Sequence, residues 1–158
     1  MKTHEIGEKC DGCGVCARFC PVFAISRTKP RPLEINPLRC VNCGVCGRIC
    51  PRKAISDNNG NACVPLKRSL WPKPSIDTVL CSACGICVHD CTPNALSISR
   101  PKFRGDIQVY AELSAPEKCV NCSLCEKNCP LGAVKMSPPP MTPADSEQSA
   151  DTEAEVSS

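Results

Sequence analysis

Four cysteine runs of identical spacing, C-x2-C-x2-C-x3-C, constrain this chain more than any other feature of its sequence. They account for all but one of its 17 cysteines, and only Cys63 lies outside them. A repeat of this kind defines the architecture before local patterns are considered. The runs are Cys10, Cys13, Cys16 and Cys20; Cys40, Cys43, Cys46 and Cys50; Cys81, Cys84, Cys87 and Cys91; and Cys119, Cys122, Cys125 and Cys129.

So many cysteines in 158 residues indicate either a disulfide framework or metal ligation. Disulfides are typical of exported proteins, but the first ten residues contain no apolar run of the kind found in a secretory signal. An odd count of 17 also leaves one thiol unpaired in any full set of disulfides. We therefore expect a cytoplasmic protein whose cysteines stay reduced and bind metal.

The spacing within each run distinguishes between metals. A 4Fe-4S cluster needs one thiolate for each iron, and runs of this spacing supply such thiolates. Zinc sites typically combine two separated C-x2-C or Cys/His pairs, which fits three consecutive cysteines poorly in a chain with 2 histidines. The sequence therefore predicts four 4Fe-4S clusters.

In two-cluster domains with this run, the fourth cysteine ligates the other cluster. We therefore expect crossed ligation between runs one and two, and again between runs three and four. The expected ligand sets are Cys10, Cys13, Cys16 and Cys50 (site one); Cys20, Cys40, Cys43 and Cys46 (site two); Cys81, Cys84, Cys87 and Cys129 (site three); and Cys91, Cys119, Cys122 and Cys125 (site four).

The repeat extends beyond the cysteines. Three runs continue with proline, whereas the third continues with Thr92 and places its proline one residue later, at Pro93. At a fixed offset after each run, an alanine is followed by an aliphatic residue. These pairs are Ala24–Ile25, Ala54–Ile55, Ala95–Leu96 and Ala133–Val134.

Between the runs the sequence predicts short elements. Residues 107–113 alternate apolar and polar, which is typical of a half-buried strand, and residues 33–35 and 96–98 are weaker candidates. The three residues before each fourth cysteine are expected to begin brief helices. Only five aromatic residues are available for a core, so we expect metal binding to stabilise the fold.

The predicted organisation is a two-cluster domain at 1–60, a linker at 61–76, a second two-cluster domain at 77–136 and a tail at 137–158. The linker contains Pro65, Pro72 and Pro74. The tail contains five acidic residues and no Lys or Arg, a composition that favours disorder.

The runs from Cys10 to Pro21 and from Cys40 to Pro51 resemble the two-cluster ferredoxins of anaerobic bacteria and archaea. The resemblance covers residues 5–60 and about 76–136, and as a tandem the chain is similar to the polyferredoxins of methanogenic archaea. It implies an α+β fold of two tandem ferredoxin domains, with small antiparallel sheets and short helices around the clusters. A nested arrangement, as in the four-cluster subunits of molybdopterin oxidoreductases, is the alternative, although its motifs are usually less regular.

The expected function is the transfer of single electrons between donor and acceptor oxidoreductases. The alternative is an integral iron–sulfur subunit of a hydrogenase, formylmethanofuran dehydrogenase or molybdopterin enzyme. We expect no catalysis by the chain itself, since the sequence has no nucleotide-binding fingerprint and no catalytic side-chain set.

Scattered basic residues and few aromatics exclude nucleic-acid binding. No apolar stretch approaches the roughly 18 residues of a membrane span, so contact with a membrane complex would be peripheral.

Three residues outside the ligand sets are candidates for other roles. Cys63 is expected to be an unligated thiol, with redox sensing or an intermolecular disulfide as alternatives. His4 is expected to be exposed. His89 is expected to be solvated, with tuning of a nearby cluster as the alternative, because the same slot is basic in every run. The slot holds Arg18, Arg48, His89 and Lys127.

Overall fold

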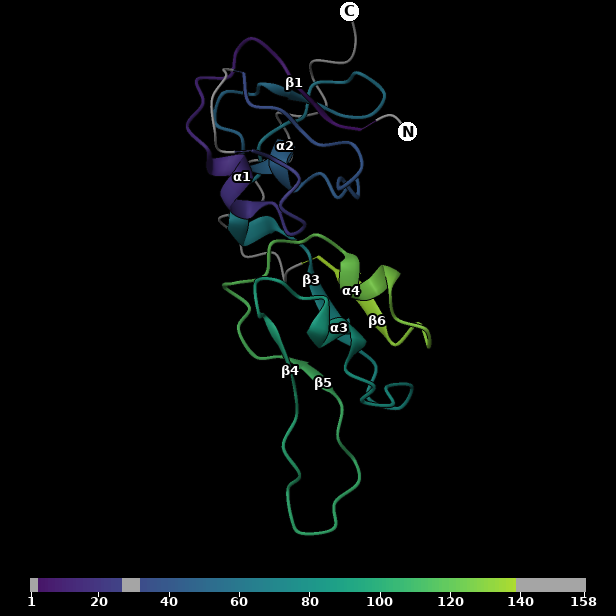
Figure 1. Cartoon of the computed structure of the whole chain (residues 1–158). Coiled ribbons are helices and arrows are strands. Elements are labelled where there is room, and N and C mark those ends of the chain that lie inside the picture. The colour runs from purple at the N-terminus through teal and green to yellow at the C-terminus, as the bar shows by residue number, and fades with distance from the viewer. Residues whose placement is uncertain (1–2, 27–31, 139–158) are drawn as a thin grey trace, which may run out of the picture.

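The computed structural model describes residues 3–26 and 32–138, in which each cysteine run leads into a short helix (Figure 1). None of the helices in this part of the chain is long and apolar enough to cross a membrane. The elements in chain order are β1 (Glu5–Ile6), α1 (Val15–Phe19), α2 (Val45–Ile49), β2 (Ile55–Ser56), the 3-10 helix η1 (Arg68–Leu70), β3 (Lys73–Ile76), α3 (Ile86–His89), β4 (Leu96–Ile98), β5 (Ala111–Leu113), α4 (Leu124–Lys127) and β6 (Val134–Ser137).

The helices expected from the runs are present, and their short length has a local cause. Each begins directly after a residue with left-handed backbone, and the chain leaves α1 and α2 at Cys20 and Cys50, which are extended. A residue before proline is driven to this extended conformation, so Pro21 and Pro51 limit the first two helices. Helices of four or five residues are unstable alone and depend on tertiary contacts.

Each run is tied to its partner run by one repeated hydrogen bond. The carbonyl oxygen of the repeated alanine accepts a bond from a backbone N–H three or four residues ahead of the partner run. The four bonds are Gly7 N to Ala54 O (2.8 Å), Asn36 N to Ala24 O (2.7 Å), Asp77 N to Ala133 O (2.8 Å) and Ala115 N to Ala95 O (3.1 Å).

Small antiparallel sheets extend these contacts. In the N-terminal half (residues 3–26 and 32–66) β1 pairs with β2, and Ile25 forms an isolated bridge with Ile35. In the C-terminal half (residues 71–138) β3 pairs with β6, and β4 pairs with β5. Both halves therefore pair their segments in the same order, and all three sheets are two-stranded.

The repeated alanine–aliphatic pairs form much of the core, as the sequence predicts. All eight residues of these pairs are buried, together with ligand-candidate cysteines such as Cys16, Cys46 and Cys87. The buried residues otherwise include few large side chains. The core therefore consists mainly of small aliphatic groups packed around thiols.

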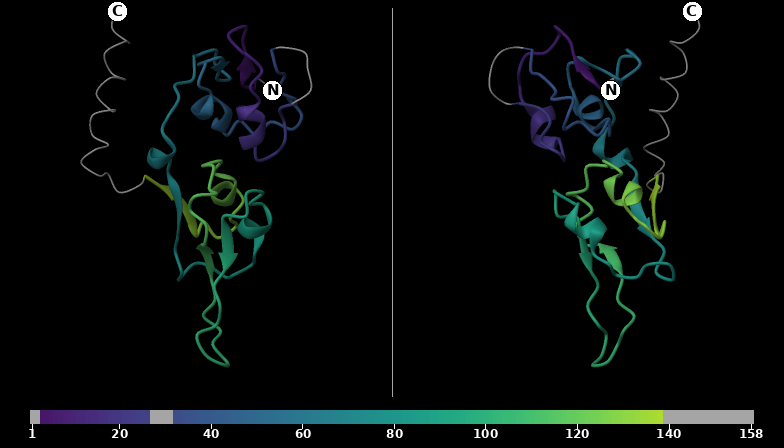
Figure 2. Two further views of the ribbon diagram at one scale, coloured as in Figure 1. Left: turned by 90° about the vertical axis from the view of Figure 1, so that its left-hand side faces the viewer. Right: turned by 45° about the vertical axis from the view of Figure 1, so that its right-hand side comes forward.

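The two halves meet at a small apolar cluster around Trp71. Trp71 and Val45 are fully buried and pack with Val120. The Trp71 indole N–H donates to the Leu66 carbonyl at 3.0 Å, which satisfies its polar group. Figure 2 shows the two halves one above the other in both views, joined by the segment that leads into β3.

The strand expected at 107–113 is only partly present. β5 covers Ala111–Leu113, and Ile107 is 90 % exposed. Its partner β4 ends at Ile98, and Pro101 has no N–H with which to continue the ladder. Residues 99–110 instead form a long projecting loop, seen at the bottom of Figure 1. β4 agrees with the weaker candidate at 96–98.

The expected linker and tail also differ in detail. The segment 61–76 contains η1 and β3, and Cys63 N donates to Ile55 O at 2.8 Å, so this segment is packed rather than free. The tail was expected to begin at Ser137, but Ser137 pairs with Lys73 in the β3–β6 sheet. Residues 139–158 lie outside the described part, and the expectation of disorder applies to them.

Trp71 provides a test of how the halves are held together. Truncating a buried aromatic side chain typically costs about 3–5 kcal/mol, so we expect Trp71→Ala to loosen the contact between the halves. The variant should keep its iron, because no cysteine is changed. Limited proteolysis should cut residues 64–70 faster than in the wild type. Phe103→Ala, at a side chain that is 68 % exposed, is the control; equal cleavage rates in both variants would contradict the role of Trp71.

Candidate iron–sulfur sites

The cysteine side chains gather around four cavities, each lined by thiols from two runs. Three thiols come from one run, and the fourth comes from the partner run of the same half. The groups are Cys10, Cys13, Cys16 and Cys50; Cys20, Cys40, Cys43 and Cys46; Cys81, Cys84, Cys87 and Cys129; and Cys91, Cys119, Cys122 and Cys125. These are the groups expected for sites one to four; their ligation of clusters in this pattern stays a prediction.

Left-handed backbone shapes each loop around its cavity. In every run the residue before the second cysteine and the residue after it both have positive φ, and so does the third residue after the fourth cysteine. Such angles are uncommon outside glycine, with asparagine the best tolerated alternative. The positions are Gly12, Asn42, Ala83 and Asn121; Gly14, Gly44, Gly85 and Ser123; and Phe23, Lys53, Asn94 and Gly132.

This backbone path directs N–H groups at sulfur. The N–H of the repeated alanine lies 3.2 Å from the sulfur of the fourth cysteine in two runs, Ala24 to Cys20 and Ala95 to Cys91. The N–H of Ala111 also donates to Cys81 Sγ at 3.4 Å. Hydrogen bonds of this kind stabilise negative charge on sulfur and tune the potential of a bound cluster.

Several thiols in these cavities, Cys16 and Cys46 among them, are poorly suited to exist as free thiolates. Burial raises the pKa of Cys16 to about 11, with further contributions from Cys10, Cys50 and Cys13. Burial and the neighbouring Cys43 raise the pKa of Cys46 to about 12. A bound cation offsets such a penalty, because metal binding displaces the thiol protons. Four thiols around one cavity, at least some of them partly or fully buried, are therefore a donor set that suits a positively charged iron centre.

Cys129 shows the opposite balance. Burial raises its pKa, but backbone N–H groups of Leu131, Ala133, Val134 and Gly132 outweigh this effect, and the pKa falls below its usual value. The N–H groups belong to the turn that follows the run. The fourth cysteine therefore receives its stabilisation from the backbone that leads into β6.

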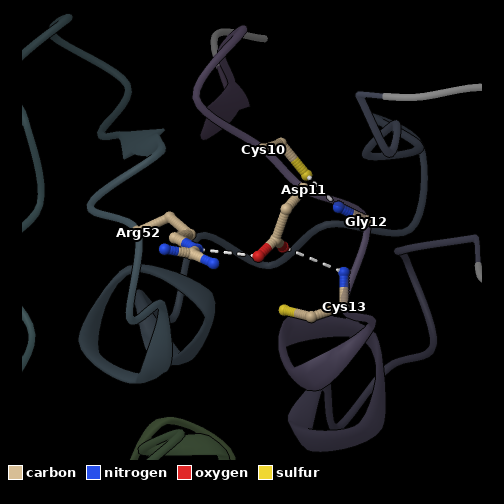
Figure 3. A network of polar contacts seen from close by, with 5 residues as sticks. All are labelled: Cys10, Asp11, Gly12, Cys13 and Arg52. Carbon is tan, nitrogen blue, oxygen red and sulfur yellow. Dashed lines mark hydrogen bonds and ion pairs between the residues drawn. The ribbon is translucent and has the colours of Figure 1, made fainter.

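An exposed ion pair joins the two runs around site one (Figure 3). Arg52, two residues after Cys50, lies 2.7 Å from Asp11 in the loop between Cys10 and Cys13. The Arg52 hydrogen bond, with a bond from Cys13 N–H, lowers the Asp11 pKa to about 2. Gly12 N–H also donates to Cys10 Sγ at 3.4 Å. The pair thus connects the loop holding three thiols to the segment holding the fourth.

The residues around the cavities fit iron–sulfur clusters. Within residues 3–26 and 32–138, no three His, Cys, Asp or Glu side chains converge as the ligands of a single metal ion would. The cavities instead offer four thiols each, with N–H donors beside the sulfurs. Site and fold together define an iron–sulfur protein of the ferredoxin type.

Comparison with known proteins agrees with this class. The model of the 4Fe-4S dicluster domain family matches residues 9–54 and again 80–133. An uncharacterized ferredoxin of Methanocaldococcus jannaschii is 38 % identical over 66 residues, which cover 40 % of this chain and 94 % of that protein. The chain belongs to the 4Fe-4S dicluster domain family. It is a ferredoxin-like electron carrier, and its two dicluster domains account for four 4Fe-4S clusters.

A weaker structural likeness was also found. A chain of the formate dehydrogenase–heterodisulfide reductase–formylmethanofuran dehydrogenase complex from Methanospirillum hungatei is 25 % identical, with a TM-score of 0.34. The match covers 81 % of the present chain, which spans 52 % of the length of that chain. This TM-score is too low to support an argument about the fold.

Cys63, His4 and His89, the three residues outside the ligand sets, differ in how well their exposure agrees with the expectation. Cys63 is partly buried against the N-terminal core, and burial raises its pKa. His4 was expected to be exposed, which is wrong: it is 7 % exposed, lines the site-two cavity and lies 3.3 Å from Asn42 Oδ1 through Nδ1. The His89 side chain is 90 % exposed and contacts the Asp90 carboxylate.

Iron and sulfide analysis tests the cluster content. Four cubes on sixteen thiols correspond to about 16 iron atoms and 16 acid-labile sulfides per chain, and the anaerobic protein should be brown. Chelating the iron should unfold the chain, because its apolar core is small and metal binding is coupled to folding. Zinc without labile sulfide would contradict this expectation.

Proposed function

We propose that the chain relays single electrons between a donor and an acceptor oxidoreductase through four crossed cluster sites in two tandem domains. The domains are residues 1–60 and 77–136; residues 61–76 connect them and contribute β3 to the sheet of the second domain. The observation that carries the proposal is the grouping of sixteen cysteines into four cavities of four. Sites of this kind suit one-electron transfer.

Crossed ligation is supported by the source of each fourth thiol. Cys50 lies in the cavity of run one, and Cys20 lies in the cavity of run two. The C-terminal half repeats this exchange with Cys129 and Cys91. The alanine hydrogen bonds between partner runs bring each fourth cysteine to the other run's cavity.

The tandem arrangement is supported over the nested one by strand pairing. β1 pairs with β2, and β3 pairs with β6, so each pair encloses one half of the chain. A nested arrangement would instead exchange fourth cysteines between runs that lie far apart in the sequence. In the described part of the chain, the cavities combine thiols only from runs one and two or from runs three and four.

The residues of the chain prepare each site for one-electron chemistry. When bound, a 4Fe-4S cluster supplies a one-electron couple whose potential depends on hydrogen bonding to sulfur and on exposure to solvent. Backbone N–H groups such as those of Ala24 and Ala95 stabilise charge on the sulfurs. Aliphatic side chains, among them Ile25, Ile35 and Val45 at site two, exclude water.

Exposed apolar side chains favour docking onto partner proteins. Leu38 and Val79 are 95 % and 91 % exposed and occupy equivalent positions, two residues before Cys40 and Cys81. Such side chains mark a protein contact when they form a contiguous patch, and Val79 is followed by Leu80, which is 52 % exposed. This observation also favours the second candidate, a fixed iron–sulfur subunit of an oxidoreductase, in which these side chains would be covered permanently.

Electron transfer itself can be tested with the purified holoprotein. Anaerobic reduction with dithionite should bleach the visible absorption and produce EPR signals from reduced clusters. Mixing with oxidised cytochrome c should restore the absorption as the cytochrome becomes reduced. Clusters that resist reduction, or reduced protein that fails to reduce the acceptor, would contradict the proposed function.

Replacing Cys20 by alanine tests the crossed ligation. Because Cys20 lines site two, we expect the loss of about a quarter of the iron, one cluster of four. Alkylation of the holoprotein, mapped by mass spectrometry, should then label Cys40, Cys43 and Cys46 while Cys10 stays protected. Cys63→Ser is the matched control and should keep all its iron. Labelling of Cys10, Cys13 and Cys16 instead would show that ligation is confined to each run.

A further inference from the structure

The second cysteine of each run has two different environments. Of all the cysteines, only Cys13 and Cys84 are exposed, and they are the second cysteines of runs one and three. Their equivalents in runs two and four, Cys43 and Cys122, are partly buried. The same position is therefore open to solvent at sites one and three and covered at sites two and four.

What covers Cys43 and Cys122 is the contact between the two halves. Both pack against the same apolar cluster, which includes Trp71. The loops of sites two and four therefore face each other across the contact.

Arg48 joins these two loops directly. Its Nη2 donates to the carbonyl oxygen of Cys43, in site two, at 2.8 Å. The same nitrogen donates to the carbonyl oxygen of Asn121, beside Cys122 in site four, also at 2.8 Å. One partly buried guanidinium thus holds the two loops at a fixed separation.

Thr92 makes a second connection and explains the departure of run three from the repeat. Its hydroxyl donates to the Pro21 carbonyl at 2.8 Å, which links the residue after Cys91 to the residue after Cys20. Its backbone N–H donates to Asp90 O at 3.0 Å. The proline found at this position in the other runs could donate neither bond.

We propose that electrons cross between the halves at this junction of sites two and four, so that the sites act in the order one, two, four, three. The inference rests on the proposed relay function. Sites one and three, with Cys13 and Cys84 exposed, are the ends at which partner proteins exchange electrons. Arg48 is a positioning residue that sets the separation of the central pair and adds positive charge beside both of its members.

Paired deletion of sites tests this order. Cys13→Ala with Cys84→Ala leaves sites two and four, and Cys43→Ala with Cys122→Ala leaves sites one and three. After dithionite reduction and iron analysis, EPR of the first variant should show a signal broadened by magnetic interaction between two clusters. The second should show two isolated signals. Isolated signals in the first variant, or interaction in the second, would overturn the proposed order.

Charge substitution in the intact chain gives a second test that removes no cluster. Arg48→Gln should lower the reduction potentials of two of the four clusters, because positive charge favours the more negative reduced state. Arg18→Gln is the matched control: it occupies the same slot of run one but is exposed, where solvent screens its charge. It should shift the potentials less than Arg48→Gln does.

Redox titration followed by EPR measures both variants. An Arg48→Gln protein whose four potentials equal those of the wild type, or shift no more than in Arg18→Gln, would overturn the role of Arg48. The two proposals can be told apart. A protein that does not exchange electrons with dithionite and cytochrome c contradicts the relay function, whereas a protein that does so and shows the wrong EPR interactions contradicts only the order of the sites.

Discussion

The gathering of four thiols from two cysteine runs around one cavity is the constraint on which the rest of this structure depends. It requires backbone that turns sharply at both sides of the second cysteine, and left-handed residues such as Asn42, Ala83 and Ser123 accept some strain there. It also explains why helices of four or five residues and two-stranded sheets suffice. These short elements position thiols and backbone N–H groups around the cavities, and the buried aliphatic residues fill the space that remains.

Local features of the sequence predicted these parts well. The runs, the alanine–aliphatic pairs and the short helices repeat at fixed offsets, so each is specified by residues close to it in the chain. The contacts between distant segments were not predictable in this way. The Arg52–Asp11 ion pair, the burial of His4 and the position of Trp71 arise only when separate segments meet. The prediction of a strand over all of 107–113 was partly wrong for the same reason: the partner strand β4 ends too early to pair with residues 107–110.

The junction between the halves shows how a repeated unit can acquire distinct roles without new motifs. The second cysteines of runs one and three, Cys13 and Cys84, are exposed to solvent. Those of runs two and four, Cys43 and Cys122, are partly buried at the contact between the halves. Two side chains make the difference: Thr92, in place of proline, reaches Pro21, and Arg48 reaches Asn121, although run one has an arginine in the same slot. Because both residues lie outside the ligand sets, the cysteine pattern alone does not distinguish a terminal site from a central one.

Trp71 is the only tryptophan of the chain and is fully buried in the apolar cluster against which Cys43 and Cys122 pack. Iron–sulfur centres absorb broadly in the near ultraviolet and visible, where indole emits, so a cluster bound at either site quenches this residue by energy transfer. The chain therefore contains its own optical probe. We expect its emission to be weak while clusters fill the sites beside it and to rise when those clusters are lost. The filling of these sites can thus be followed in solution without attaching any label.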